Sequence, residues 1–494
     1  MSFDKPTVDW FALSPELIML GAAAVCLLGA VMSPGSWRRP FGATVCALGF
    51  LGAGVAAAFL FAESDEPRAI VADAARRDQL AALAKLILAG CGLLAVGTGY
   101  SRRMSDARVG EYYALIATAA AGMAFFVSAN NLMTLFLGLE WFSIALYVLC
   151  AIDLDREESL EAGLKYLIVG GFGSAVLLFG SALVYGATGE LGFERIAAAT
   201  GEQGLTDDSL LVFGLALMLA GLGFKASAAP FHMWTPDVYQ GAPTPVTAFM
   251  SAATKVAALV LTLRVLTTAF PELDELWTVA VAVIACFSLA VGNLAALVQR
   301  DVKRLLAYSS VSHAGFMLIA IAANNELGGR ALLYYLIPYA AMSIGAFAVV
   351  AARERELGRP VALDDLAGFG WEQPLLGLSM FVFMIGFAGL PLTGGFFGKL
   401  YAFAAAYEAG WWWLMLAGVA ATVISLYYYL GVIRAMYMRP SAELQFAAAG
   451  GSPPREWLLG ATVLAAVVVT VGSFFAVEPV VDVARDAAAS LPLD

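Results

Sequence analysis

The sequence predicts an all-α membrane protein of about fourteen transmembrane helices. Of its 494 residues, 61% are hydrophobic and only 14% are charged, and the mean hydropathy is +0.80. Soluble domains are nearer half apolar and about a quarter charged. Apolar stretches of about 20 residues recur along the chain, and each is long enough to cross a hydrocarbon core of about 30 Å. A soluble multidomain protein is therefore excluded.

The predicted spans are separated by short polar loops. The first span has no basic stretch before it, so we expect it to be retained rather than cleaved as a signal. The odd-numbered loops carry about twice as many Lys and Arg residues as the others, which places them in the cytoplasm and both termini outside. The predicted spans are 13–32, 40–61, 80–99, 110–128, 131–151, 160–187, 209–243 (interrupted), 244–270, 274–297, 303–323, 329–352, 372–409 (interrupted), 412–436 and 457–477.

Four ionisable residues are expected near the membrane midplane, on four different spans. An ionised group at that depth costs at least about 2.5–3.5 kcal/mol, so the four need a joint explanation. A structural ion pair is one alternative, but three lysines facing one glutamate leave buried positive charge unpaired. A buried lysine instead tends to titrate, which favours a proton relay. The four residues are Glu140, Lys225, Lys255 and Lys399.

Other charges lie nearer the span ends. We expect Lys85 and Arg264 to extend toward the membrane surface. Glu16 is interpreted as a first-turn residue that caps its helix. Lys165, four residues after Glu161, suits either a local ion pair or a water-connected relay near a proton entrance, and both interpretations remain open.

Two spans are interrupted close to a lysine. Pro230 removes a backbone hydrogen bond in the seventh span, and Thr235 is predicted to cap a new short helix after it. The twelfth span has Gly389 and Pro391 shortly before Lys399. Paired interruptions of this kind mark ion sites in transporters. Their spacing predicts two five-helix units, 110–270 and 274–436, between an N-terminal three-helix segment (1–109) and a C-terminal helix with a short tail (437–494).

Both histidines occupy positions where water is expected. His232 lies in the interruption of the seventh span, and His313 lies in the tenth span, five residues after Tyr308. Each is either a proton-transfer group or an ordinary buried residue. The five cysteines are isolated, and no dinucleotide- or phosphate-binding motif is present, so we expect no cofactor or metal in this chain.

The stretch FKASAAPFHMWTPDVYQGAPTPVTAFMSAATKVA, residues 224–257, closely resembles the signature of the antiporter-like subunits of respiratory complex I, the bacterial NADH-quinone oxidoreductase. The resemblance runs through all the predicted spans and is strongest over 130–400. A lysine at position 399, where the M-type branch has glutamate, and the lack of the L-type branch's long lateral helix favour the N-type branch. The positions that match the family's key residues are Glu140, Lys165, Lys225, Lys255 and Lys399.

The resemblance implies an inverted pair of repeats and a translocase subunit that pumps protons while quinone is reduced elsewhere in the complex. NADH, FMN, Fe–S clusters and quinone would then be bound by partner subunits. The implied neighbours are an M-type subunit on one side and small K-, J- and A-type subunits on the other, with lipids but no nucleic acid, in the bacterial inner membrane. A subunit of a cation/proton antiporter or membrane-bound hydrogenase, or a non-transporting scaffold, remains the alternative.

Overall fold

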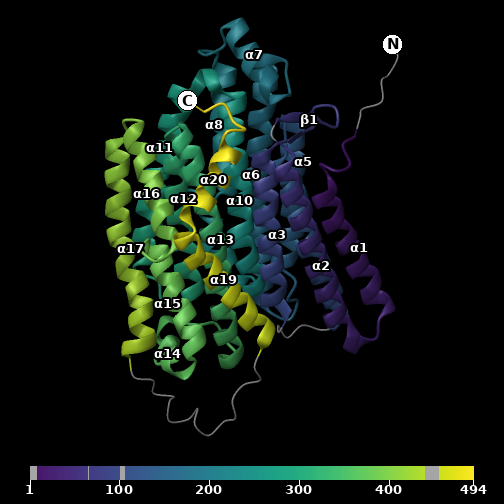
Figure 1. The fold of residues 1–494 in the computed structure, drawn as a ribbon, viewed down its shortest axis with the longest axis vertical. Coiled ribbons are helices and arrows are strands. Elements are labelled where there is room, and N and C mark those ends of the chain that lie inside the picture. The colour runs from purple at the N-terminus through teal and green to yellow at the C-terminus, as the bar shows by residue number, and fades with distance from the viewer. Residues whose placement is uncertain (1–7, 65, 101–105, 440–455, 494) are drawn as a thin grey trace.

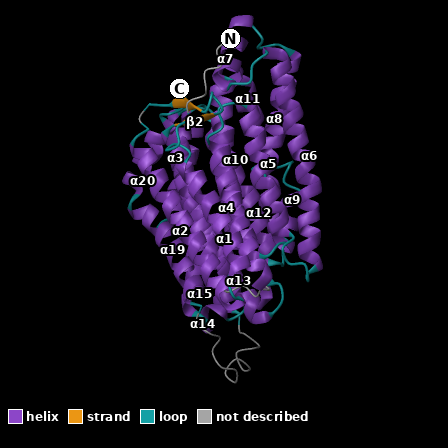
Figure 2. Ribbon diagram, turned by 90° about the vertical axis from the view of Figure 1, so that its right-hand side faces the viewer, coloured by secondary structure: helices purple, strands orange, loops and turns teal. Residues whose placement is uncertain are grey.

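The computed structural model describes residues 8–64, 66–100, 106–439 and 456–493. The chain forms an elongated bundle whose helices run roughly along its long axis (Figures 1 and 2). Twelve helices in the described part are long and apolar enough to cross a membrane. Two shorter apolar helices, α8 (Ser209–Lys225) and α15 (Pro374–Ala388), are the first halves of the predicted interrupted spans. The all-α membrane fold is confirmed, and the total of fourteen spans stays a prediction.

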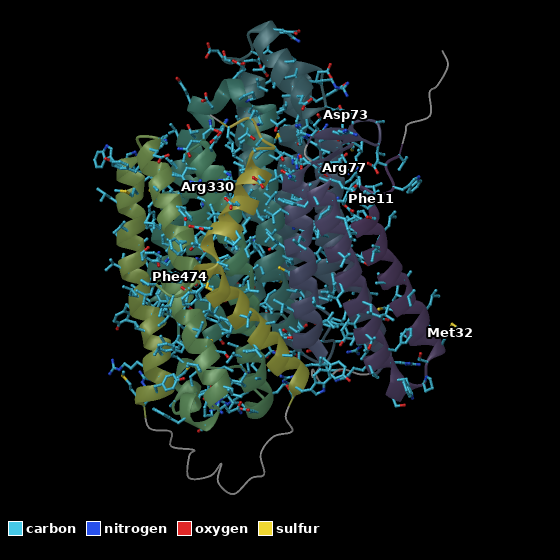
Figure 3. All side chains as sticks on the ribbon, viewed as in Figure 1. Phe11, Met32, Asp73, Arg77, Arg330 and Phe474 are labelled. Atoms are coloured by element: carbon cyan, nitrogen blue, oxygen red, sulfur yellow. The ribbon has the colours of Figure 1, made fainter. Side chains whose placement is uncertain are left out.

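The first segment contains three long helices and a β-hairpin that the sequence did not indicate. Strands β1 and β2 pair antiparallel, with Ile70 opposite Ala75. The hairpin lies at the end of the bundle where α1 begins: Asp73 and Arg77 lie near Phe11, which precedes α1, and far from Met32 at the other end of that helix (Figure 3). Bounds in this segment are α1 Ser14–Met32, α2 Gly35–Ala62, β1 Arg68–Ile70, β2 Ala75–Arg77 and α3 Gln79–Tyr100.

The next segment contains the first interruption. The short helix after it begins at Trp234, and its capping residue is Met233, so the prediction that Thr235 is the N-cap is wrong. Met233 already has helical backbone angles, and the Thr235 hydroxyl lies inside the helix without a hydrogen-bond partner. The helices are α4 Asp106–Val127, α5 Leu132–Cys150, α6 Glu157–Thr188, α7 Phe193–Gln203, α8 Ser209–Lys225, α9 Trp234–Gly241 and α10 Thr244–Ala269.

The second half contains the other interruption and ends in a short amphipathic helix, α20, that the sequence prediction left as a tail. This helix follows the last span directly and packs against α3 and α13 (Figure 1). The bounds are η1 Pro271–Leu273, α11 Asp274–Ala296, α12 Val302–Ala322, α13 Glu326–Leu357, η2 Leu363–Leu366, α14 Phe369–Glu372, α15 Pro374–Ala388, α16 Gly394–Glu408, α17 Trp412–Met438, α19 Trp457–Phe475 and α20 Val477–Ala488.

The core of the bundle is formed by α10, α12 and α13. Every residue of α10 is buried, as are nearly all residues of α12 and most of α13, whereas α1, α2, α6, α17 and α19 expose large apolar side chains. The sequence of α10 is rich in Ala, Thr and Val, and small side chains let neighbouring membrane helices approach closely. The most protected helix of the protein is therefore the one that carries Lys255.

Candidate functional site

Lys225 is the last residue of α8, and its side chain is 1% exposed. The chain leaves the helix directly after it: Ala226 is the C-terminal cap, and Ser227 has a positive φ of 59°. Backbone of this kind is tolerated at membrane depth only where protein or water surrounds it. The interruption of the seventh span thus places an ammonium group inside the bundle, beside irregular backbone.

Aromatic side chains surround the ammonium group of Lys225. Its Nζ lies 3.5 Å from the hydroxyl oxygen of Tyr166. It also lies 5.0 Å from the ring centroid of Phe142, 5.7 Å from that of Tyr147 and 5.2 Å from that of Tyr166. Cations within about 6 Å of an aromatic face are attracted by the ring quadrupole. Three rings from α5 and α6 therefore face Lys225.

The expected ion pair between Glu140 and Lys225 is not formed in this structure. The carboxylate oxygens of Glu140 and Nζ of Lys225 are more than 4.0 Å apart. The charge of Glu140 still acts on Lys225 over this distance. The Oε1 atom of Glu140 is buried and has no hydrogen-bond partner. The acid and the lysine are therefore close enough for their charges to interact but are not in contact.

The other two midplane lysines bind backbone carbonyls at the two interruptions. Lys255 of α10 donates to the carbonyl oxygen of Ala226 at 3.0 Å, and Lys399 of α16 donates to that of Ala388 at 3.1 Å. Ala226 caps α8, and Ala388 is the last residue of α15. Carbonyls at a helix C-terminus lack an intrahelical partner and lie at the negative end of the helix dipole. Each helix break therefore provides an acceptor for a lysine from another helix.

His313 joins three helices of the second half. Its Nδ1 is 2.8 Å from the hydroxyl oxygen of Tyr335 on α13, and its Nε2 is 3.0 Å from that of Tyr429 on α17. The ring is buried, and Lys255 and Lys399 are the two cations that act on it. Both nitrogens of His313 thus have hydroxyl partners, and the side chain lies in the electrostatic reach of both lysines.

His232 and Tyr308 are near each other but outside this hydrogen-bonded group. Their ring centroids are 6.4 Å apart, and the buried Nδ1 of His232 has no hydrogen-bond partner. The guanidinium of Arg304 lies 5.9 Å from the Tyr308 ring centroid. The structure therefore divides the sequence-predicted polar residues into a central set around His313 and a separate pair at the first interruption.

Lys165 belongs to an ion cluster that the sequence analysis did not identify. Its Nζ is 2.8 Å from Glu161 and 3.0 Å from Asp237, whose other oxygen is 2.6 Å from Arg304. The local ion pair with Glu161 is present. The separation of Asp237 from Lys165 and Arg304 in the sequence does not predict that these three residues meet. Asp237 connects α6, α9 and α12.

Two predictions about charges near span ends are wrong. Arg264 does not extend toward the surface: its side chain is 1% exposed and forms two hydrogen bonds, of 2.6 and 2.8 Å, with Asp78. Lys85 is also buried, 2.7 Å from Glu16, which forms this ion pair and makes no capping hydrogen bond to its helix. Local sequence patterns do not predict these ion pairs, because Asp78 and Glu16 lie far along the chain from Arg264 and Lys85.

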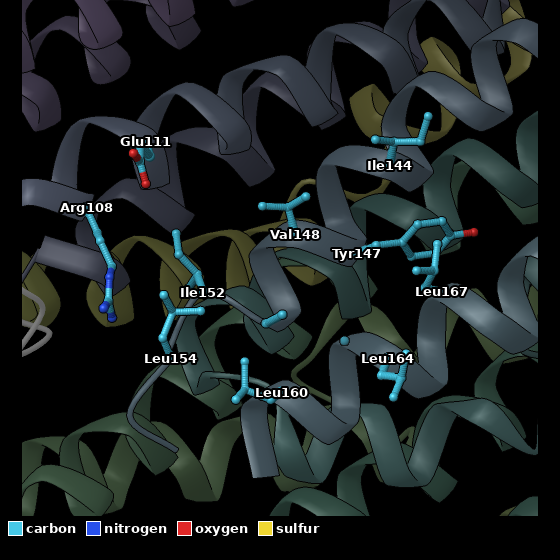
Figure 4. A pocket seen from close by; sticks show the side chains of 12 residues that line it. Arg108, Glu111, Ile144, Tyr147, Val148, Ile152, Leu154, Leu160, Leu164 and Leu167 are labelled. Carbon is cyan, nitrogen blue, oxygen red and sulfur yellow. The ribbon is translucent and has the colours of Figure 1, made fainter. Parts of the chain in front are cut away.

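A groove of about 490 Å³ opens on the outer surface between α5 and α6 (Figure 4). Most of its lining is apolar, with Arg108 and Glu111 at one end and Tyr147 toward the other. Tyr147 is also one of the rings that face Lys225. One side chain is thus shared between the groove and the surroundings of Lys225.

Within the described residues, no cluster of three or more His, Cys, Asp or Glu side chains has the arrangement of a metal site. The contacts that the sequence did not predict are mostly between hydroxyls. They pair inside the bundle as Ser310 with Tyr339 at 3.0 Å and Ser251 with Ser343 at 2.7 Å, and as Ser309 with Tyr429. Tyrosine and serine in apolar spans were the only available signal, and they are ordinary in membrane helices.

Known proteins resemble this chain over most of its length. Residues 129–425 match the family described as "NADH:quinone oxidoreductase/Mrp antiporter, TM". Subunit N of NADH-quinone oxidoreductase from Trichlorobacter lovleyi is 40% identical over 438 residues, which cover 88% of this chain and 89% of the relative. The subunit of the same name from Parvibaculum lavamentivorans is 43% identical over 358 residues, 72% of this chain and 74% of the relative.

Solved structures agree with the sequence relatives. A chain of respiratory complex I from Thermus thermophilus has a TM-score of 0.78 and 35% identity, with 95% of this chain and 98% of that one covered. A chain of the Mrp complex from Dietzia sp. has a TM-score of 0.84 at 20% identity over 97% of both chains, which shows a shared fold alone. This chain belongs to the NADH:quinone oxidoreductase/Mrp antiporter family, within its branch of N subunits of the proton-translocating NADH-quinone oxidoreductases.

Proposed function

We propose that this chain, a membrane-arm subunit of a proton-translocating NADH-quinone oxidoreductase, moves protons along Lys225, Lys255, His313 and Lys399, with Glu140 controlling the first lysine. One observation carries the proposal. The three lysines are buried on three helices, and in the described part of the chain none of them forms an ion pair. Their hydrogen-bond acceptors are neutral oxygens.

Neutral acceptors suit a lysine that changes its protonation state. A carboxylate in contact with a buried lysine favours the charged form and opposes proton release. A backbone carbonyl accepts a hydrogen bond from an ammonium group and from a neutral amine alike. Lys255 and Lys399, each on such a carbonyl, therefore keep their position whether or not they carry the proton.

The proposed sequence of events begins at Glu140. When Glu140 approaches Lys225, it stabilises the protonated lysine, and when it withdraws, the proton is held less strongly and can pass to Lys255. Lys255 is close in space because it binds the residue that follows Lys225. His313 and its tyrosine partners continue the path toward Lys399. Moving one charge against 100 mV costs about 2.3 kcal/mol, which is on the scale of one partly hydrated ion pair.

Lys165, His232 and Tyr308 take less central roles in this proposal. Lys165 is 46% exposed and bound to two carboxylates, which suits a proton entrance better than a buried transfer step. His232 and Tyr308 lie beside the first interruption, where water could connect that entrance to Lys225. We assign the three residues to the entry side of the path.

The relatives' names support a setting in the membrane part of an NADH-quinone oxidoreductase. We infer that NADH, FMN, Fe–S clusters and quinone are bound by partner subunits. An M-type subunit and the small K-, J- and A-type subunits would be the neighbours on either side, with both termini outside the inner membrane. The exposed apolar residues of α6 and α17, such as Phe172 and Tyr427, support contacts with neighbouring subunits or lipids. The two interrupted helices support two five-helix repeats, 110–270 and 274–436.

Lys225→Ala in the assembled complex tests the relay. We expect NADH-driven proton pumping to be lost while the complex still assembles. Arg485→Ala, which removes a charge that is 57% exposed on α20, is the control and should pump normally. Full pumping by an assembled Lys225→Ala complex would show that the charges only hold helices together, and the scaffold alternative would replace the proposal.

A further inference from the structure

We infer that Phe142, Tyr147 and Tyr166 form an aromatic cage that holds the protonated side chain of Lys225 in place while Glu140 is withdrawn, with Tyr166 as its central positioning residue. This inference rests on the proposed role of Lys225 in the relay. It adds three residues that act neither as acids nor as bases. These three side chains together are called the cage.

The geometry of the cage fits an ammonium group. The three ring centroids are 5.0, 5.7 and 5.2 Å from Nζ, and all three rings come from α5 and α6 rather than from the helix of the lysine. Lys399 is accompanied by a single ring, Phe316, at 4.3 Å. Lys255 has a carbonyl partner instead. Lys225, the lysine without a carbonyl partner, is thus the one that three rings surround.

Tyr166 is fixed in this position by other aromatic side chains. Trp234 of α9 stacks on it with a centroid distance of 4.5 Å, and Tyr147 meets it edge-on at 4.8 Å. The indole nitrogen of Trp234 donates to the carbonyl oxygen of Phe224, the residue before the lysine, at 3.0 Å. The second half of the interrupted span therefore helps to position the cage. Trp234 of α9 stacks on Tyr166, and Tyr166 faces Lys225.

The cage explains how a buried cation is kept without a touching carboxylate. Rings attract a cation most strongly where water is excluded, and Tyr166 is fully buried. Because this attraction is weaker than a direct ion pair, it favours the protonated form of Lys225 without preventing proton release. The titratable or charged side chains around Lys225 are Glu140, Tyr147 and Cys150 of α5, Tyr166 of α6, Tyr239 of α9 and Lys255 of α10.

Two substitutions at Tyr166 separate the ring from its hydroxyl. Tyr166→Phe removes the oxygen 3.5 Å from Nζ and keeps the ring, whereas Tyr166→Leu removes the ring. Because the ring favours the charged lysine, its loss should move the alkaline limb of the pumping–pH profile to lower pH. We expect a shift of about one pH unit for Leu, equivalent to about 1.4 kcal/mol, and little shift for Phe.

Phe126→Leu is the matched control, because Phe126 is a buried ring packed on Phe142 that no described cation faces. It should leave the profile where it is. If Tyr166→Leu fails to assemble, Phe142→Leu removes another ring of the cage and should give the same shift. An unchanged pumping–pH profile in Tyr166→Leu, or in Phe142→Leu where that variant is used instead, overturns the cage. The relay still stands in that case if Lys225→Ala abolishes pumping. Full pumping by Lys225→Ala overturns the relay itself.

Discussion

The side chain of Lys255 reaches from α10 to the carbonyl oxygen of Ala226, 3.0 Å away, at the end of α8. The bond spans 29 residues of sequence and places the Lys255 ammonium group at the residue that follows Lys225. The interruption of α8 is what makes the carbonyl available, since a continuous helix would use it internally. The broken helix therefore supplies the acceptor that positions the Lys255 side chain.

Lys255→Met is expected to stop pumping. Methionine keeps an unbranched side chain of similar length but carries no proton, so transfer beyond Lys225 fails and pumping per assembled complex falls at least about tenfold. The carbonyl of Ala226 loses its partner, which should also cost about 1–3 kcal/mol of stability. Thr254→Ser, which retains the hydroxyl bonded to the carbonyl oxygen of Met250, is the control. Reconstituted proteoliposomes with a pH-sensitive dye measure both variants.

The four ionisable residues could be identified from the sequence because a charged residue inside an apolar span stands out without any structure. Lys225, Lys255 and Lys399 are all buried, as that reasoning required. It failed where the partner of a charge was distant in sequence. Arg264 and Asp78 are separated by 186 residues, and no local pattern connects them.

The sequence also did not predict which groups contact the buried lysines. A glutamate and a lysine at one depth predict an ion pair, yet Lys225 faces aromatic rings that look like ordinary apolar residues in the sequence. The carbonyl partners of Lys255 and Lys399 carry no side-chain signal at all, because any residue supplies a carbonyl. The sequence therefore predicts which lysines are buried better than it predicts which groups contact them.

Gly389→Ala should lower pumping by displacing Lys399. Gly389 has a φ of 78°, and a Cβ there would lie 2.7 Å from Cδ of Lys399. Two effects are expected: a backbone cost of about 1–2 kcal/mol for alanine in the left-handed region, and a shift of the lysine from the carbonyl oxygen of Ala388. The stability loss is measured by thermal inactivation, and the shift of Lys399 by pumping at fixed complex content.

Gly358→Ala separates these two effects. Gly358 caps α13 with a φ of 68°, and a Cβ there would meet nothing within 4 Å. It carries the same backbone cost without touching a relay residue, so it should lower stability and leave pumping intact. Equal pumping losses in the two variants would mean that general destabilisation, rather than the position of Lys399, causes the defect.

His313→Phe should interrupt the path between Lys255 and Lys399. The substitution keeps an aromatic ring but removes both nitrogens, and with them the contacts to Tyr335 and Tyr429. We expect pumping to fall at least about tenfold, with smaller losses for Tyr335→Phe and Tyr429→Phe. Tyr334→Phe is the control: it removes a buried hydroxyl bonded to the Ser473 carbonyl, away from His313, and should change stability by about 1 kcal/mol without affecting pumping. Unimpaired pumping by His313→Phe would remove His313 from the path.

Arg264→Met should destabilise the protein without directly affecting the relay. The guanidinium of Arg264 and the carboxylate of Asp78 are both fully buried, so removing the cation leaves a buried charge and costs about 3–5 kcal/mol. Arg76, 3.4 Å from the same carboxylate, compensates in part and places the expected loss at the lower end of that range.

The double variant Arg264→Met with Asp78→Asn decides whether the uncompensated charge is the cause. Asparagine removes the charge and still accepts the hydrogen bond that the backbone nitrogen of Ala81 donates to Asp78 at 2.8 Å. Because no charge then remains unpaired, most of the lost stability should return, as measured by thermal unfolding of the purified complex. Arg485→Ala, which breaks an exposed ion pair, is the control and should lower the free energy of unfolding by less than about 1 kcal/mol. A double variant no more stable than Arg264→Met would show that the arginine stabilises the bundle by packing, since its long side chain fills the space between α10 and the start of α3.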